Sequence, residues 1–401
     1  MTSKLLLLLL HVFACLDATL AETKILQAVL RGTKGNENVF GLVSVTEDLE
    51  SGDVTVEAMV DGLADGEHGF HIHTYGDIVG ADDGTAAAGH YNPAGVDHAG
   101  PDDATRHVGD LGNIESSSGV ATYSRTFAST DVSKPTVVGD LGSSIIGRSF
   151  VIHADPDDLV SQPTGAAGPR VAVGVIGIGN QDIYNEDSAA DTALATEVVE
   201  HVESGDFEAP EALVCKIVGD GIDGFGAVTL DANGVAEFRA SVTGLTPGPH
   251  GYHIHWYGEE YEFSTSNSTA ERDLGRAGGH YNPAGVMHGL PDGTAPRHYG
   301  DGGNIIADDD GMGNLVVSLP DVTELTTLVG RTCLVHAGED DGSDPAGNAG
   351  PRIAAGQLGY ANPDTDISVS VDDSTSGGLV MAPATTLAFS ALAPMLLFVY
   401  M

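Results

Sequence analysis

A block of histidines with fixed spacing occurs twice in this 401-residue chain. The first copy contains HGFHIH, AGHYNPAG and RHVGDLGN, and the second contains HGYHIH, GGHYNPAG and RHYGDGGN in the same order. A single histidine on a strand is more often a structural residue than a ligand, but that explanation would have to hold at every matching position. Self-similarity of this kind predicts two tandem copies of one domain, each built around a metal site.

The rest of the sequence is typical of an all-β protein. The chain has 54 glycines and few aromatic residues, and helical periodicity is scarce. Runs that alternate apolar and polar residues, such as residues 53–60 (DVTVEAMV), recur between turns rich in Gly, Asn and Asp. Such runs indicate short antiparallel strands, and we expect each copy to form a β-sandwich or β-barrel.

The charge balance restricts the partners. The chain carries 16 basic and 58 acidic residues, a formal net charge of −42. Binding to nucleic acid needs a basic face, which this composition cannot build, so no nucleic-acid partner is expected. A solvated acidic surface is the simpler interpretation, and a surface that gathers cations or suits a salty medium is the alternative.

Composition predicts where the two copies begin and end. We place domain 1 at residues 22–180 and domain 2 at residues 208–363. Residues 181–207 are strongly acidic, so repulsion between like charges favours an extended linker there. Residues 1–21 combine a lysine, a leucine run and a small-residue end, which predicts a secretory signal peptide and an extracellular protein. A lipoprotein anchored at Cys15 is the less favoured reading.

The C-terminal region predicts a membrane anchor. A stalk at residues 364–376 ends in small residues, and residues 377–401 form a spacer followed by an apolar tail. That order is typical of a glycosylphosphatidylinositol (GPI) signal that is removed, with Ser376 as the expected attachment site and Ser374 or Gly377 as competitors. A membrane-spanning tail is the alternative, although a basic flank is missing.

Two cysteines, Cys215 and Cys333, remain after removal of the signal peptide. Both lie in apolar runs of the second copy. A secreted protein permits a disulfide, but the sequence does not reveal whether the two strands meet, so buried free thiols stay the simpler interpretation.

Histidine spacing predicts the geometry of the metal site. His71 and His73 lie two positions apart on a strand and therefore point to the same face. His153 ends an apolar run and can reach this pair. His90, His98 and His107 follow in a loop-like sequence before Asp110, and three imidazoles with one carboxylate suit a closed zinc site. Copper prefers imidazole-rich sites with an open position.

The chain resembles copper/zinc superoxide dismutase in the motifs HGFHIH, AGHYNPAG, RHVGDLGNI, GRSFVIHADPDDL and GPRVAVGVIGIG. Each copy shows this resemblance, and together the two copies cover nearly the whole mature chain. It implies a Greek-key β-barrel or sandwich in each copy. Copper would bind in the first copy to His71, His73, His90 and His153, and zinc to His90, His98, His107 and Asp110. Copper would bind in the second copy to His253, His255, His280 and His336, and zinc to His280, His288, His298 and Asp301. His90 and His280 would bridge the two ions.

The resemblance also implies the activity. An extracellular enzyme of this family converts superoxide to dioxygen and hydrogen peroxide by Cu(II)/Cu(I) cycling, with His90 and His280 taking part in proton transfer. Asp157 and Asp340 match the carboxylate that hydrogen-bonds a copper ligand and a zinc ligand together. Arg170 and Arg352 match the arginine that guides the anion. The alternative is an acidic cell-surface or matrix protein whose metal sites serve only stability.

The sequence also departs from the family pattern. The family disulfide is absent from both copies, because Val173 and Ala355 occupy its last-strand position. Metal binding or packing between copies is expected to restrain the ligand loops instead. The loop before His280 is longer than its counterpart and carries a glycosylation sequon at Asn267. The copies could pair within one chain or between chains.

Overall fold

In a computed structural model, the described residues are 23–80, 82–137, 144–180, 210–260 and 273–365. The expected signal peptide, the linker at 181–207, the sequon at Asn267 and the attachment site at Ser376 lie outside them. The regular elements within the described residues are β-strands and short 3-10 helices. No helix in this part of the chain is long and apolar enough to cross a membrane.

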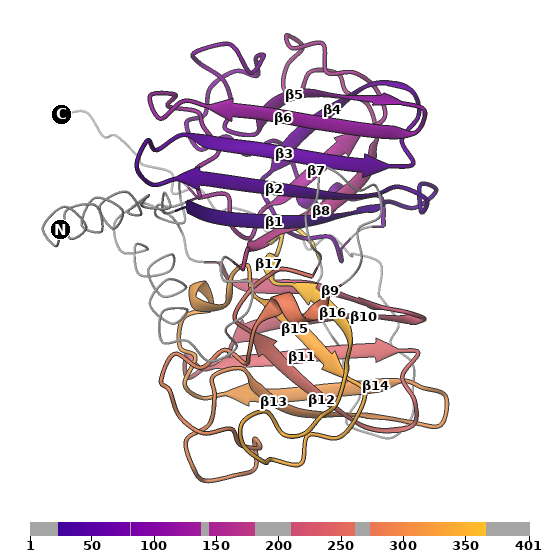
Figure 1. The fold of residues 1–401 in the computed structure, drawn as a ribbon, viewed down its shortest axis with the longest axis vertical. Helices are drawn as coiled ribbons and strands as arrows, with labels where there is room; N and C mark the ends of the chain where they lie inside the picture. Colours follow the sequence, from indigo (N-terminus) through magenta and orange to yellow (C-terminus); the bar gives the residue numbers. More distant parts are fainter. Residues whose placement is uncertain (1–22, 81, 138–143, 181–209, 261–272, 366–401) are drawn as a thin grey trace, which may run out of the picture.

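The first copy forms a closed antiparallel barrel, in the upper half of Figure 1. Its strand order, β1-β2-β3-β6-β5-β4-β7-β8, closes through the pairing of β8 with β1 and is a Greek-key arrangement. The strands are β1 (Thr23–Gly32), β2 (Phe40–Asp48), β3 (Val54–Asp61), β4 (Gly66–His73), β5 (Asp110–Ser117), β6 (Val120–Phe127), β7 (Ser149–His153) and β8 (Arg170–Ile178). The short helix η1 (Thr85–Ala87) lies in the long connection between β4 and β5.

The second copy repeats this barrel. Strands β10-β11-β14-β13-β12-β15-β16-β9 follow the same order, and β9 closes the ring by pairing with β10. The strands are β9 (Ala212–Gly219), β10 (Ile222–Leu230), β11 (Ala236–Thr243), β12 (Gly248–His255), β13 (Asp301–Ala307), β14 (Gly313–Leu319), β15 (Thr332–His336), β16 (Arg352–Gln357) and the short β17 (Gly359–Tyr360). The 3-10 helices are η2 (Leu274–Ala277) and η3 (Leu325–Leu328). The expected fold class, two tandem all-β domains, is therefore confirmed.

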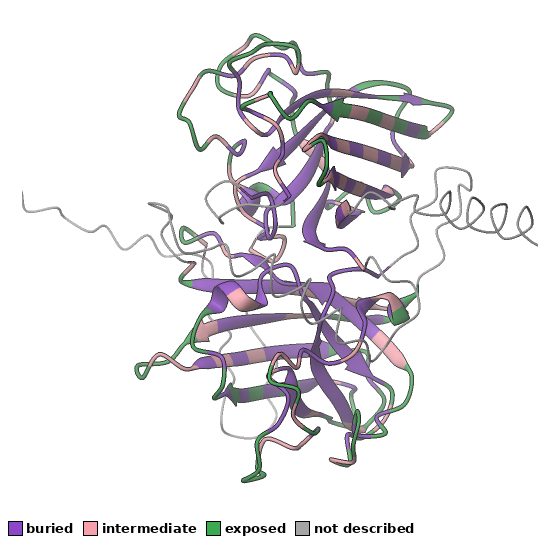
Figure 2. Cartoon of the chain, turned by 60° about the vertical axis from the view of Figure 1, so that its left-hand side comes forward, coloured by how far each residue is buried: buried purple, intermediate pink, exposed green. Residues whose placement is uncertain are grey.

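Residue alternation explains why these segments are strands. In β3, every second residue from Val54 to Val60 is buried and the residues between are half-buried. One face of the strand therefore fills the barrel while the other meets solvent, as the banding along the strands in Figure 2 shows. Strands β7 and β15 are instead buried along their whole length, which fits their place between the barrel core and the metal-ligand loops.

The two barrels pack against each other with approximate two-fold symmetry. Ile178 N donates to Gly330 O at 2.8 Å, and the equivalent Tyr360 N donates to Gly147 O at 2.8 Å. One apolar cluster continues from the first barrel into the second across this contact. Equivalent patches of the two copies thus face each other, as in a symmetric dimer, but within one chain.

Cys215 and Cys333 lie next to each other inside the second barrel. Both are buried, on β9 and β15, and their Sγ atoms are 2.6 Å apart with both thiols free. The strands that carry them therefore do meet, a point that the sequence left open.

Close contacts of glycines at the interface indicate that a larger side chain there should separate the barrels. A Cβ on Gly177 would lie 2.8 Å from Gly258 Cα, and its nearest neighbours all belong to the second barrel. We expect Gly177→Val to suit strand β8 but to wedge the interface at a cost of ~1–3 kcal/mol. Small-angle scattering should show a larger radius of gyration, and hydrogen exchange should show loss of protection at the Ile178 amide.

The matched control is Thr122→Val, which places the same side chain on the exposed face of β6. An unchanged radius of gyration in Gly177→Val, with the Ile178 amide still protected, would contradict this account of the interface.

Candidate metal centres

Four imidazoles converge at one end of the first barrel. Strand β4 ends in His71 and His73, whose side chains share one face, and β7 ends in His153 beside them. An isolated bridge between residues 73 and 90 brings His90 from the loop to the same place. All four are buried, and one nitrogen of each lies within 4.8 Å of the others.

Each imidazole in this set is oriented by a hydrogen bond on its outer side. His71 Nε2 is 2.9 Å from Asp157 Oδ2, His73 Nδ1 is 2.7 Å from Ala88 O, and His153 Nδ1 is 3.0 Å from Gly168 O. These oxygens only accept, so the outer nitrogens carry the protons and the inner nitrogens present bare lone pairs. A cluster of inward lone pairs without a donor fits a bound cation.

Unpartnered atoms support this conclusion. Among the described residues, His71 Nδ1 and His90 Nε2 are buried with no hydrogen-bond partner. His73 Nε2 and His153 Nε2 lie 3.3 Å apart, and neither has a proton to share when its outer nitrogen donates. Leaving buried polar groups unpaired costs free energy, so a metal ion is the natural partner. Four imidazoles form a donor set that suits copper.

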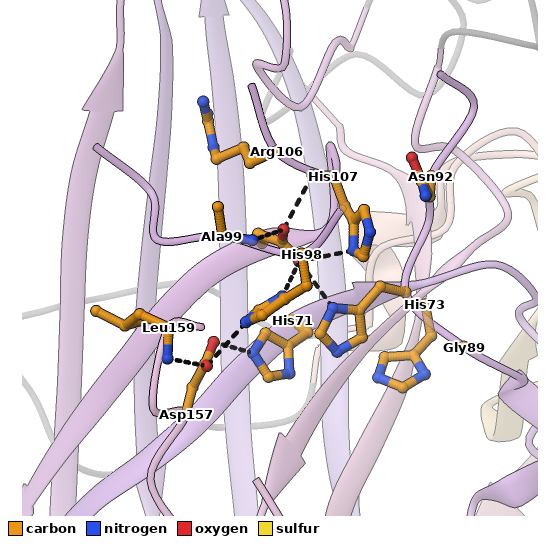
Figure 3. A network of polar contacts seen from close by, with 12 residues as sticks. His71, His73, Gly89, Asn92, His98, Ala99, Arg106, His107, Asp157 and Leu159 are labelled. Carbon is orange, nitrogen blue, oxygen red and sulfur yellow. Dashed lines mark hydrogen bonds and ion pairs between the residues drawn. The ribbon is translucent and has the colours of Figure 1, made fainter. Parts of the chain in front are cut away.

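A second cluster surrounds one oxygen of Asp110, at the start of β5. His90 Nδ1 lies 2.8 Å from Asp110 Oδ1, His98 Nδ1 2.9 Å and His107 Nδ1 3.0 Å. The outer nitrogens of His98 and His107 face acceptors, namely Asp157 Oδ1 at 3.0 Å and Val96 O at 3.0 Å. A positive charge, either a proton or a metal ion, must therefore lie between these nitrogens and the carboxylate. Figure 3 shows Asp157 joined by dashed lines to His71 and His98.

The donors of the second cluster fit zinc. Three imidazoles and one carboxylate form a four-ligand set of the closed, structural kind. The other oxygen, Asp110 Oδ2, accepts from the backbone amides of Ala99 at 3.1 Å and His107 at 2.9 Å, which fixes the carboxylate. His90 belongs to both clusters, with Nδ1 in this one and Nε2 in the other. A single imidazole therefore joins the two sites.

Burial and the neighbouring charges set the protonation of these histidines. Burial lowers the pKa of His71 to about 3 and that of His153 to about 4. Both are therefore neutral near pH 7 and free to bind a cation. Burial also opposes the charged form of His98, but its hydrogen bonds to Asp110 and Asp157 prevail and raise its pKa to about 9. In metal-free protein, a proton thus takes the place of the cation at His98.

The second barrel repeats both clusters. His253 Nε2 contacts Asp340 Oδ2 at 3.0 Å, His255 Nδ1 contacts Gly278 O at 2.7 Å, and His336 Nδ1 contacts Gly350 O at 2.9 Å. The inner nitrogens of the four-imidazole set are buried without a partner among the described residues: His253 Nδ1, His255 Nε2, His280 Nε2 and His336 Nε2. Around Asp301 Oδ1 lie Nδ1 of His280 at 2.8 Å, of His288 at 3.0 Å and of His298 at 3.1 Å.

Asp157 ties the two clusters of the first barrel together. Its two carboxylate oxygens contact Nε2 of His71 and Nε2 of His98, and Asp340 makes the same pair of contacts to His253 and His288. Both aspartates therefore lie where the sequence pattern placed them. Their contacts hold one imidazole of each cluster in a fixed orientation.

Sequence reasoning missed two kinds of residue that support Asp157. Asn113 donates through Nδ2 to Asp157 O at 2.9 Å and accepts from Asp157 N at 2.7 Å. Gly165 has a φ of +70°, and a Cβ there would collide with the Asp157 carboxylate. Asn304 and Gly347 are the counterparts in the second barrel. The repetition of these residues in both copies was the available signal.

Arg170 lies beside the four-imidazole set, at the start of β8. Its guanidinium donates to Gly84 O and Ala88 O, and Ala88 O also accepts from His73. Arg352 likewise donates to Leu274 O at 2.6 Å and to Gly278 O at 2.7 Å, the carbonyl that accepts from His255. Both arginines remain partly exposed. Each places a positive charge at the edge of a cluster.

Apolar packing stands where the family disulfide would be. Val173 on β8 packs against Ala87 of η1, with Val151 and Ile78 beside them. In the second barrel, Ala355 packs in a cluster with Leu274 and Ala277 of η2. The ligand loop is thus attached to the last strand by side-chain contact.

Gly165 generates a direct test of the bridging carboxylate. We expect Gly165→Ala to push Asp157 away from His71 and His98 and to weaken metal binding by the first barrel about 10- to 100-fold. Competition with a chelator would measure the change. Gly95→Ala is the control, because Gly95 has a similar φ of +61° but nothing within 4 Å of its Cβ position. Equal metal affinity in the two variants would refute the role given to Gly165.

A family profile and one relative show which family the chain belongs to. The family profile described as copper/zinc superoxide dismutase (SODC) matches residues 39–176 and 225–358, which together exceed half of the chain. The chain is 45% identical over 150 residues to "Superoxide dismutase [Cu-Zn] A" of Xenopus laevis, a match that spans 36% of this chain and 92% of that protein. A solved structure titled "Crystal Structure Analysis of the clock protein EA4" is 27% identical, covering 39% of this chain and 99% of that one with a TM-score of 0.34. The chain belongs to the copper/zinc superoxide dismutase family, with two tandem domains of that family.

Proposed function

We propose that both domains are superoxide dismutases that bind one copper and one zinc each. The single observation that carries this proposal is the double role of His90 and of His280, whose two nitrogens face a four-imidazole set on one side and an imidazole–carboxylate set on the other. A purely structural site does not need an imidazole shared between two different donor sets. The net reaction consumes two superoxide ions and two protons and yields dioxygen and hydrogen peroxide.

The chain's own residues would act in three ways. Copper in the four-imidazole set would supply one-electron redox chemistry, and zinc in the other set a fixed charge at Nδ1 of His90. His90 would hold or release a proton at Nε2, the buried atom that lacks another partner among the described residues. Asp157 would keep His71 and His98 oriented, and Arg170 would attract the anion to the exposed edge.

Single-site variants test the function and the independence of the domains. Fully loaded protein should contain two copper and two zinc ions per chain. His153→Ala should abolish turnover by the first barrel and leave roughly half of the total rate, because the clusters of the two barrels share no residue and should act additively. His336→Ala is the matched variant in the second barrel.

Two outcomes would contradict this proposal. Complete loss of activity in either single variant would show that the sites are not independent. Full metal content without superoxide turnover would instead support the alternative, a cell-surface protein that uses its metal sites for stability.

Charge reversal at Arg170 tests anion guidance. In a His336→Ala background, Arg170→Glu should lower the superoxide rate about tenfold or more, because it replaces an attraction by a repulsion. Copper content should stay level, since Arg170 contributes no ligand atom. The rate of the parent should fall as salt is added, and the rate of the variant should fall less. Equal rates and equal salt dependence would remove Arg170 from the guidance of substrate.

We also propose that the chain is secreted and held on the outer cell surface by a GPI anchor at Ser376. The sequence patterns at the two ends of the chain support this proposal. The acidic composition separately argues against a nucleic-acid partner. Phosphatidylinositol-specific lipase should release the protein from cells, and mass spectrometry should find no peptide from residues 384–401. A lipase-resistant protein that retains those peptides would be held by a spanning helix.

A further inference from the structure

In each barrel, the end of the last stretch of strand and the residues directly after it contact the other barrel. In the second barrel this segment begins at β17, which lies at the junction in Figure 1, and continues through Asn362 to Thr365. In the first barrel it is the end of β8, followed by Asn180. Asn362 and Asn180 occupy equivalent places in the two copies, two residues after the equivalent pair Tyr360 and Ile178.

Asn362 holds the ligand loop of the first barrel. Its side-chain Nδ2 donates to Ala86 O of η1 at 2.8 Å, and its backbone N donates to Asp77 Oδ2 at 3.2 Å. Thr365 Oγ1 donates to the same Asp77 oxygen at 2.7 Å. Asp77 is fully buried, and its other oxygen accepts from two amides of its own loop. The end of the second domain is therefore hydrogen-bonded to the ligand loop of the first.

This loop orients a metal ligand of the first barrel. Helix η1 ends at Ala87, and the next carbonyl, Ala88 O, accepts from His73 Nδ1 and from Arg170. The position of Ala88 O depends on the turn that Asn362 contacts two residues earlier. A contact made by the second domain thus influences the orientation of His73 in the first domain.

The reciprocal contact exists in the second barrel. Asn180 Nδ2 donates to Arg276 O of η2 at 3.0 Å, and Asn180 N donates to Glu259 Oε2 at 2.6 Å. Two residues after Arg276, Gly278 O accepts from His255 and from Arg352. Glu259 and Asp77 are equivalent in the repeat, so each copy supplies the other with the same pair of hydrogen bonds.

We propose that Asn180 and Asn362 are reciprocal positioning residues: each fixes the metal-ligand loop of the opposite domain. The loop has no disulfide to the last strand and contacts it through the packing of Val173 on Ala87 and the hydrogen bonds of Arg170. The hydrogen bonds of Asn362 restrain the loop from the interface side. Each metal-ligand loop is then fully restrained only when the two barrels are docked.

Hydrogen exchange on the metal-free full chain tests this inference without requiring metal or turnover. The reporters are matched amides, Tyr75 N bonded to Ala87 O at 3.2 Å and Tyr257 N bonded to Ala277 O at 3.0 Å. Loss of one hydrogen bond should speed exchange about five- to tenfold. We expect Asn362→Ala to affect Tyr75 and not Tyr257, and Asn180→Ala to affect Tyr257 and not Tyr75.

Asn362→Asp and Asn180→Asp sharpen the test, because each keeps a side chain of the same size but places a negatively charged acceptor, in place of the amide donor, against a carbonyl oxygen. Asn314→Ala, at an exposed position on β14, is the control. Exchange in strand β7 reports whether a variant is still folded. An effect confined to the variant's own domain, equal effects on both loops, or effects no larger than the control would each overturn the proposal.

A second readout uses copper-loaded protein, in which Asn362→Asp should speed the transfer of copper from the first barrel to a chelator and leave the second unchanged. If each variant speeds hydrogen exchange in the opposite domain but the protein shows no superoxide turnover, the positioning role stands and the proposed function is rejected. If the protein turns over superoxide but the variants do not affect the opposite domain, the proposed function stands and the positioning role is rejected.

Discussion

The two buried aspartates that contact the clustered histidines of each barrel determine which charges the site must hold. Asp157 and Asp110 are almost entirely shielded from water. Asp157 contacts one imidazole of each cluster, and Asp110 faces three imidazoles of the second cluster. A buried carboxylate is costly unless positive charge lies nearby. Because the outer nitrogens of the histidines are committed to acceptors, that charge must sit between the inner nitrogens. The buried carboxylates of each barrel therefore favour bound cations, whether or not the site is catalytic.

The features that could be predicted from sequence are those that depend on local periodicity. Alternation in residues 53–60 predicted a strand, and β3 occupies Val54–Asp61. The two-residue spacing of His71 and His73 predicted a shared face, because successive side chains of a strand alternate. The ligand sets followed from the family resemblance, and the structure brings each set together. Copper and zinc identities remain predictions.

The features that could not be predicted arise from contacts between segments far apart in the chain. Gly165 matters only because its missing Cβ leaves room for the Asp157 carboxylate, which no local pattern reveals. The meeting of Cys215 with Cys333 depends on barrel closure. The contact of Asn362 with Ala86 joins residues in different domains, so it requires the docking of two folded barrels. The sequence indicated that packing between copies could restrain the loops but gave no residues.

Duplication within one chain changes the balance of forces at this interface. A net charge of −42 opposes the association of separate chains, since like charges repel over about a Debye length, ~8 Å at physiological salt. A linker converts that association into an intramolecular step with a high effective concentration, so weak contacts suffice. Close approach of Gly177 to Gly258 and of Gly76 to Gly359 then lets backbone meet backbone at the junction. Under the proposed function, the same screening length would confine the repulsion of superoxide to nearby carboxylates, while Arg170 and Arg352 lie partly exposed at the edge of each cluster. An acidic surface is therefore compatible with the anion-attracting role proposed for the two arginines.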